Sequence, residues 1–344
     1  MRERRKIVEL WRRGKAAALV TLVRVEGSSY RRVGARLLVG VDGEYAGSIS
    51  GGCLEAEVVR KAAWMTRSGA VVERYSTLFD DTAEIPYGLG CGGTVDLLIE
   101  PAATPEFEAL MEALDASLRG EERRVVTSLP ESGRPLRRVV GEVAIEGAVT
   151  GIEEWIAAPQ RLFVFGAGDD AQPMVQMAAL LGWDVTVVDG RAHWARAERF
   201  PEAVKVISAE SFEGLTELEI GGRDAAVVMT HSYEQDRVWL GELLVRGPRY
   251  LGLLGARHRS ALLVSETAVK LGWSVDRACA GLFAPVGLDL GGDGAEAIAL
   301  AVIAEIQACC EGKLGVSRRM TAETVAEQVA KGGASRYLQT QCAL

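Results

Sequence analysis

The sequence has few of the residues on which metal-dependent and nucleophilic enzymes rely. Its 344 residues include only 3 histidines and 6 cysteines. All the histidines, at positions 193, 231 and 258, lie in the second half of the chain. No Cys-x-x-Cys pair is present, and no histidine accompanies the cysteines of the first half. These absences argue against a zinc site and against a nucleophile–histidine pair built wholly within the first half.

Long apolar runs are also missing. No stretch reaches the ~20 residues of a membrane helix, and the charged start MRERRKIVELWRRGK has no apolar core after it. The cysteines, at 53, 91, 279, 309, 310 and 342, are too scattered for a disulfide framework, which predicts a cytoplasmic protein. The net charge of -8 argues against nucleic acid or an anionic membrane as a partner.

The length and composition predict a globular protein of two domains. Hydrophobic residues make up 48% and charged residues 25% of the chain, which is enough to form two cores. The best boundary is the segment 157–160, which carries Pro159 and precedes a buried strand. We therefore predict an α+β domain over residues 1–158, a Rossmann-like domain over 159–312, and a tail over 313–344 in which only residues 322–331 are predicted to be helical.

The clearest pattern is the stretch RLFVFGAGDDAQPMVQMAALLGWDVTVVDG, residues 161–190. An apolar strand leads into Gly166, Gly168 and Ala171, a G-x-G-x-x-A turn that opens a helix. A second strand ends at Asp189, 21 residues after Gly168, where a dinucleotide-binding fold places its ribose acceptor. Alternating strands and helices continue to residue 310, which predicts a doubly wound parallel sheet.

Two acids beside this turn leave its ligand open. Asp169 and Asp170 lie at the start of the helix, where they suit the helix dipole but repel a pyrophosphate. One interpretation is a nucleotide site that prefers NAD to NADP because of Asp189. The other is a Rossmann domain kept for its shape, with a weakened or altered site.

Further candidates follow the later strands of this sheet. His231, with Asp236 close behind it, could hold a metal or move a proton, although a helix capped by Ser232 explains the spacing equally well. Asp289 stands in a glycine turn before the helix predicted over residues 295–310, and marks either an anion site or ordinary capping.

The first half is predicted to contain strands over residues 17–26, 35–41, 45–49, 71–75, 94–100, 123–128 and 136–143. Helices are predicted at the N-terminus, from near residue 53, and over 106–118. Cys53, in GGCLE, and Cys91, in GCGG, stand in glycine turns. The dipole and free amides of a helix N-terminus stabilise the thiolate form of a cysteine there. A thiolate can bind a transition metal or carry a sulfur atom. The alternative is that each is a small residue in a crowded turn.

Arg31, Arg32 and Arg36 form a basic island in this acidic chain. Arginine can bind a phosphate or carboxylate through two hydrogen bonds at once. Solvated surface charge is the simpler interpretation of the same residues.

These stretches together resemble the XdhC/CoxI family of maturation factors for molybdenum hydroxylases. The resemblance is carried by GSSYRRVGARLLV, SGGCLEAEV, GCGGTVDLLIEP, FVFGAGDDAQPM, VTVVDGR, VVMTHSYEQD, YLGLLGAR and PVGLDLGGDGAEAIALAVIAEI. Cys53 and Cys91 fall on the family's cysteines, whereas Asp169 stands where the family usually has histidine.

The resemblance implies a chaperone of the molybdenum cofactor, in its molybdopterin or cytidine dinucleotide form. Such a protein protects the cofactor, assists its sulfuration and delivers it to an apo molybdenum hydroxylase, with a cysteine desulfurase as a further partner and a homodimer left open. The implied ligands are Cys53 and Cys91 for the metal end, with Arg31, Arg32, Gly166, Gly168, Asp189, His231 and Asp289 as further cofactor contacts. The competing hypothesis is an NAD-dependent oxidoreductase with His231 as proton donor.

Overall fold

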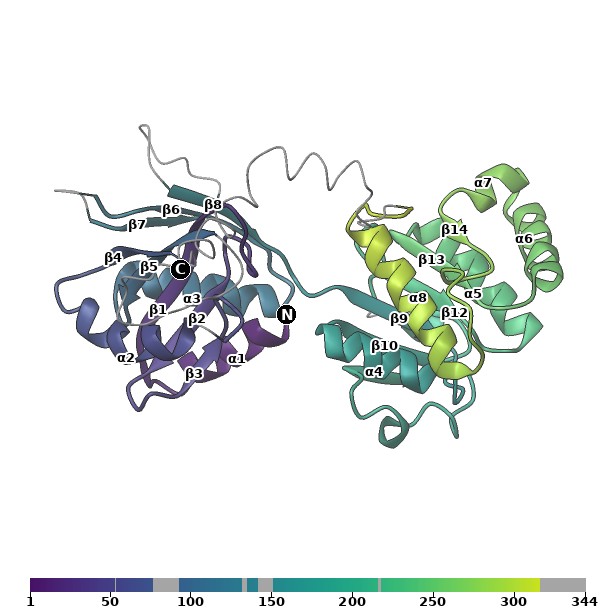
Figure 1. The fold of residues 1–344 in the computed structure, drawn as a ribbon. Coiled ribbons are helices and arrows are strands. Elements are labelled where there is room, and N and C mark those ends of the chain that lie inside the picture. The colour runs from purple at the N-terminus through teal and green to yellow at the C-terminus, as the bar shows by residue number, and fades with distance from the viewer. Residues whose placement is uncertain (53, 77–92, 132–134, 142–150, 216–217, 316–344) are drawn as a thin grey trace, which may run out of the picture.

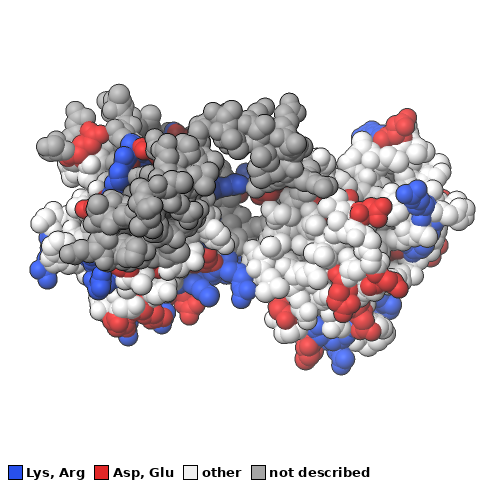
Figure 2. All heavy atoms as spheres, in the orientation of Figure 1, with Lys and Arg blue, Asp and Glu red and all other residues white. Residues whose placement is uncertain are grey.

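A computed structural model describes the chain except for residues 53, 77–92, 132–134, 142–150, 216–217 and 316–344. Two bodies lie side by side, and within the described residues the chain passes between them once, after β8 (Gly151–Ile156) and before β9 (Arg161–Phe165) (Figure 1). On the face shown in Figure 2, the visible acidic and basic side chains of the described residues are mixed over both bodies. The first body has two sheets and the second has one, and each body has its own cores.

The first body is built on a five-stranded antiparallel sheet of order β3-β2-β1-β5-β4. Its strands are β1 (Ala16–Glu26), β2 (Arg36–Gly40), β3 (Tyr45–Gly47), β4 (Val71–Ser76) and β5 (Thr94–Pro101). Its helices are α1 (Arg2–Arg12), α2 (Glu55–Met65) and α3 (Pro105–Leu118).

Both faces of this sheet are covered, because the central strand β1 is apolar on both sides. Leu19 packs with α1 and α3, whereas Val20 and Leu22 pack with α2. Neighbouring side chains along a strand point to opposite faces of the sheet, so the side chains of β1 contribute to two hydrophobic cores. This arrangement confirms the α+β class expected of the first half.

A smaller antiparallel sheet, of order β7-β6-β8, packs beside the first. It contains β6 (Arg123–Ser128), β7 (Arg137–Val140) and β8. Arg138 of β7 reaches Glu100 of β5 through two hydrogen bonds of 2.8 and 2.9 Å, and the two side chains are 1% and 0% exposed. A buried ion pair therefore ties the two sheets together.

The second body is a six-stranded parallel sheet of order β11-β10-β9-β12-β13-β14. In chain order this is 3-2-1-4-5-6, the Rossmann arrangement, and it confirms the predicted doubly wound sheet. After β9 the strands are β10 (Asp184–Asp189), β11 (Lys205–Ser208), β12 (Ala225–Val228), β13 (Tyr250–Leu253) and β14 (Leu282–Phe283).

Helices cover both faces of the parallel sheet. One core holds side chains of α4 (Ala171–Leu181) and α8 (Ala295–Cys310), and the other those of α5 (Tyr233–Arg246), α6 (Arg257–Leu271) and α7 (Val275–Cys279). The central strands β9, β12 and β13 are apolar on both sides, as strands buried on both faces require.

The N-terminal turn of α1 contacts the second body. Arg5 donates to Asp184 Oδ1 at 2.7 Å and to the Gly182 carbonyl at 3.2 Å. Gly182 ends α4 with φ of +79°, and a Cβ there would lie 2.5 Å from Cβ of Met1. Positively charged groups at the C-terminal end of a helix are favoured by its dipole, so this contact is electrostatically matched.

Most predicted elements are present with shifted ends, and the helix over residues 295–310 and the strand over 123–128 agree to the residue. Three elements were missed: β8, α7 and β14. The helix predicted over residues 322–331 lies outside the described residues, and the domain boundaries remain a prediction. In the described part of the chain, no helix has the length and apolarity needed to cross a membrane.

Candidate functional site

The chain segments beside Cys53 and Cys91 meet at one loop of the first body. Gly51 lies against the ring of Tyr30, so that a Cβ on Gly51 would be 2.9 Å from the tyrosine Cδ1. Gly93 lies against the next part of the same loop, where a Cβ would be 2.1 Å from the Ser28 carbonyl oxygen. Both cysteines themselves lie outside the described residues. Their flanking glycines nevertheless contact positions only two residues apart in the loop 27–34.

The glycine turn before α2 is held by the carboxylate of Glu55. This side chain is 3% exposed and accepts hydrogen bonds from four backbone amides and two hydroxyls. The donors are Ile49 N at 3.0 Å, Ser50 N at 2.9 Å, Gly51 N at 3.3 Å, Gly52 N at 2.9 Å, Ser48 Oγ at 2.9 Å and Ser50 Oγ at 2.5 Å.

These bonds determine the ionisation of Glu55. Burial opposes the charged form, but the hydrogen bonds from Ser50 and Ser48 outweigh it and lower the pKa of Glu55 from 4.5 to about 2. A carboxylate that accepts several hydrogen bonds is stabilised in its ionised form. Glu55 is therefore an anion at any physiological pH.

We expect acid to remove the contribution of Glu55 to stability. The pKa is lower in the folded than in the unfolded state, so the contribution is complete above pH 4.5 and is lost as pH falls toward about 2. Urea unfolding of wild type and Glu55→Gln at about pH 6 and about pH 3 should show a difference of ~3 kcal/mol that shrinks in acid. Glu57→Gln is the control, because Glu57 pairs only with Lys61 among the described residues. A difference that does not change between the two pH values would contradict the assignment.

The structure separates the three arginines of the basic island. Arg31 is paired with Glu3 of α1 through two hydrogen bonds, one of them 3.1 Å. Arg36 is buried and pairs with Glu154 of β8. The side chain of Arg32 is exposed, with no partner among the described residues. Of the two predicted phosphate ligands, Arg32 is the one that points to solvent without a described partner.

In the second body, the predicted glycine turn follows β9. Gly166 has φ of +132°, and a Cβ there would lie 2.3 Å from the carbonyl oxygen of Met229. At Gly168 the nearest atom to such a Cβ is Asp170 Oδ1, at 2.5 Å. Gly166 is thus required by the neighbouring backbone, whereas Gly168 faces a side chain that can turn aside.

Asp189 stands at the end of β10 as predicted, but its carboxylate is fully buried and its oxygens are occupied. One oxygen accepts from Ala167 N at 2.8 Å, and Arg191 binds both oxygens at 2.7 to 2.9 Å. Burial opposes ionisation, but the bonds from Arg191 and Ala167 outweigh it and lower the pKa of Asp189. The expected ribose hydroxyls would therefore find no open acceptor here unless Arg191 moved, and the residues in place do not fit NAD.

His231 does not pair with Asp236. Its Nε2 lies 2.8 Å from Asp170 Oδ2, across the mouth of the glycine turn. Asp236 is fully buried and accepts from the Thr230 amide and hydroxyl and from Arg259. Ser232 caps α5 by accepting from Gln235 N. The capped helix, left open above as the alternative, accounts for this spacing.

Asp289 is exposed in the loop before α8 and does not cap that helix. The N-cap residue is Gly294, which has no side-chain cap, and Gly294 N donates to Asp293. Within the described residues, no group of three or more His, Cys, Asp and Glu side chains is arranged to hold a metal ion. The metal site predicted on Cys53 and Cys91 lies outside that search.

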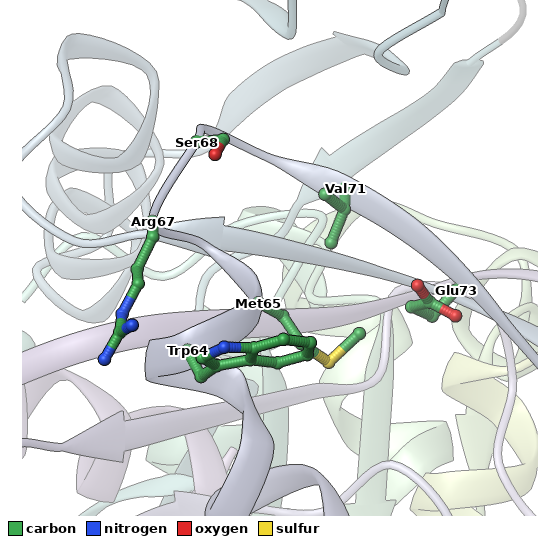
Figure 3. Close-up of a pocket in the computed structure, with 6 residues that line it drawn as sticks. All are labelled: Trp64, Met65, Arg67, Ser68, Val71 and Glu73. Carbon is green, nitrogen blue, oxygen red and sulfur yellow. The ribbon is translucent and has the colours of Figure 1, made fainter.

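A pocket of about 330 Å³ lies at the C-terminal end of α2, away from the glycine turn that precedes this helix. It is lined by Trp64 and Met65 from the helix end, by Arg67 and Ser68 that follow, and by Val71 and Glu73 from β4 (Figure 3). Its lining contains no cysteine or histidine.

Four site features were missed by the sequence analysis. Arg191 as the partner of Asp189 was within reach, because the two residues are only two positions apart. The pairs His231–Asp170 and Arg31–Glu3 join residues 61 and 28 positions apart, and no local pattern marks them. The fourth is the role of Glu55 in the loop: from the sequence alone, an acid at the start of a helix only suits the helix dipole.

Two family models match the chain. One is described as the XdhC Rossmann domain and matches residues 162–306, and the other as the XdhC and CoxI family and matches residues 10–76. A Bacillus subtilis protein, named as a probable xanthine dehydrogenase component, is 30% identical over 315 residues, which cover 84% of this chain and 92% of that protein. The chain belongs to the XdhC/CoxI family.

Other members agree in sequence and in fold. The "Molybdenum cofactor insertion chaperone PaoD" of Escherichia coli is 29% identical over 304 residues, 87% of this chain and 85% of that protein. A crystal structure from Bacillus halodurans, titled as a xanthine dehydrogenase, superposes with a TM-score of 0.77 and 26% identity over 94% of this chain and 99% of that one. The XdhC and CoxI match contains the loop 27–34, Cys53 and Glu55, whereas Cys91 falls outside both matched ranges.

Proposed function

We propose that this protein binds the molybdenum cofactor and delivers it to an apo molybdenum hydroxylase. The observation that carries the proposal is the contact of both cysteine-flanking glycines, Gly51 and Gly93, with the single loop 27–34. Membership of the XdhC/CoxI family and similarity to a protein named as a molybdenum cofactor insertion chaperone support it.

Two cysteine-bearing segments whose neighbouring glycines meet at one loop suit the metal end of the cofactor. A thiolate is a soft ligand that binds molybdenum or holds a sulfur atom, and Cys53 precedes α2, whose N-terminus favours a thiolate. We propose that Cys53 and Cys91 hold the metal end while a cysteine desulfurase supplies the sulfur for the sulfurated form. The hydroxylase then accepts the loaded cofactor.

The phosphate or nucleotide tail needs a cation outside this metal end. Arg32 is the exposed arginine of the loop 27–34 and is our first candidate for the phosphate. Arg31 would have to exchange Glu3 for the phosphate in order to contribute. The edge of the parallel sheet, with Gly166, Gly168 and His231, is proposed as the opposite wall, and Asp289 as a more distant contact.

Replacing Cys53 with serine should weaken cofactor binding by more than about tenfold, because the soft thiolate ligand is lost. The melting temperature should change little, since serine is close to cysteine in size. Cys91→Ser should act in the same direction. Cys279→Ser is the matched control, because Cys279 is an exposed thiol of the other body. Equal affinity in wild type and Cys53→Ser would remove the ligand role and leave only packing.

A reconstitution assay tests the function as a whole. Purified apo hydroxylase, isolated cofactor and this protein are combined, with and without NAD, and hydroxylase activity is followed. We expect the protein to accelerate activation and to turn over no small substrate by itself. Activation at the same rate without the protein would overturn the proposal.

The second candidate, an NAD-dependent oxidoreductase, rests on the Rossmann strand order and on the G-x-G-x-x-A turn. Against it, Arg191 occupies the Asp189 carboxylate, and Asp170 and His231 meet across the turn. We predict weak NADH binding, strengthened in Asp169→Asn because an exposed carboxylate at the turn is removed. Sub-micromolar NADH binding by calorimetry in wild type would favour the oxidoreductase.

A further inference from the structure

Among the described residues, the carboxylate of Glu55 is bound by neutral donors only. No arginine or lysine among the described residues forms a salt bridge with it, and all six donors belong to residues 48–52. Converging backbone amides make a concave binding surface for an anion, and here the anion is part of the chain. The negative charge of Glu55 is therefore stabilised by the amides and hydroxyls of residues 48–52. The conformation of these residues depends in turn on the Glu55 carboxylate.

Glu55 acts on the loop rather than on its own helix. It is the first residue of α2, and the N-cap residue Leu54 offers no side-chain hydrogen bond. An acid in this position ordinarily interacts with the amides of the first helical turn. The Glu55 side chain instead turns back over residues that precede it by three to seven positions.

The loop needs such an anchor because of its backbone. Gly51 and Gly52 have φ of +126° and +116°, a conformation that an unrestrained chain leaves easily. Gly51 also lies against Tyr30, whose side chain is 74% exposed. Holding four consecutive amides on one carboxylate fixes both the turn and its contact with the loop 27–34.

From this geometry we propose that Glu55 is a positioning residue for the cofactor site. Its carboxylate holds residues 48–52 in one conformation, and the next residue in the chain, Cys53, starts from the end of this held segment. The inference rests on the proposed function of Cys53 as a cofactor ligand. Glu55 touches no cofactor and acts through the loop.

A double-mutant cycle tests this inference. The affinity for isolated molybdenum cofactor is measured for wild type, Glu55→Gln, Cys53→Ser and the double variant, with Glu57→Gln as the control in the same helical turn. Removing a residue that orients a metal ligand lowers affinity roughly tenfold to a hundredfold, so we expect that loss in Glu55→Gln and none in Glu57→Gln. In the Cys53→Ser background, Glu55→Gln should have no further effect, because the ligand that it positions is already absent.

Chemical rescue provides a second measurement that a general loss of stability would not reproduce. Glu55→Ala leaves the amides of residues 49–52 without their carboxylate, and added formate should occupy the space and restore most of the affinity. Formate should have no effect on wild type or on Cys53→Ser. If Glu55→Ala does not fold, the cycle with Glu55→Gln decides alone.

The outcomes separate this inference from the proposed function. Full affinity in Glu55→Gln, or equal losses from Glu55→Gln with and without Cys53, would overturn the positioning role. Formate that leaves a folded Glu55→Ala at low affinity would overturn it as well. An unchanged affinity in Cys53→Ser would instead overturn the function on which the inference depends.

Discussion

Replacing Arg138 with methionine should destabilise the protein by about 3–5 kcal/mol, because a buried carboxylate would lose its countercharge. Arg138 binds both oxygens of Glu100, and it also donates to the Glu106 carbonyl at 2.6 Å and to Thr127 Oγ1 at 3.0 Å. These contacts join the two sheets of the first body to α3. The loss should therefore loosen the small sheet as well as lower the free energy of unfolding.

Urea unfolding of wild type and Arg138→Met measures this effect. The exposed pair Arg237–Glu234 gives the control, since a surface ion pair contributes only about 0–1 kcal/mol and Arg237→Met should be nearly neutral. Adding Glu100→Leu to Arg138→Met should recover part of the loss, because the unpaired charge is then removed as well. A loss below about 1 kcal/mol in Arg138→Met would show that the pair is not buried as described.

The second large effect is expected at Gly166, where alanine should cost about 3 kcal/mol or more. The φ of +132° is open to glycine and strained for alanine, and the new Cβ would lie 2.3 Å from Met229 O and 2.6 Å from Met229 C. Those atoms belong to the backbone at the end of β12, so they cannot turn away. The turn after β9 and the sheet beside it would have to move apart.

Thermal unfolding of Gly166→Ala and Gly221→Ala checks this expectation. Gly221 lies in the same body, has ordinary backbone geometry and would place no atom within 4 Å of an added Cβ. Gly221→Ala should therefore leave the melting temperature nearly unchanged, whereas Gly166→Ala lowers it by many degrees. Equal melting temperatures in the two variants would contradict the close approach of β12.

Local patterns in the sequence predicted most elements because their signals are short-range. The strand over residues 161–165 is continuously apolar, and the helix over 295–310 has a run of small and apolar residues bounded by glycine. The missed elements lack such signals. β8 contains two glutamates, and β14 has two residues that become a strand only by pairing with β13.

The candidate site divides in the same way. The glycine turns, Asp189 at the end of β10 and the two cysteines in glycine segments were visible because each depends on a few neighbouring residues. The partner of each charged group was not. Arg31 binds Glu3, His231 binds Asp170 and Arg138 binds Glu100, and the residues of these pairs lie 28, 61 and 38 positions apart.

The sequence by itself therefore determined the Rossmann half, the α+β half and the residues able to do chemistry, since periodicity and turn residues act over a few positions. Only the tertiary structure decided which of those side chains are exposed and which are bound by another residue. It enclosed Asp189 with Arg191, and it brought the segments beside Cys53 and Cys91 to one loop. The physical reason is that a side chain's partners depend on packing between distant segments. The same carboxylate or guanidinium can face solvent or an opposite charge without any change in its neighbours in the chain.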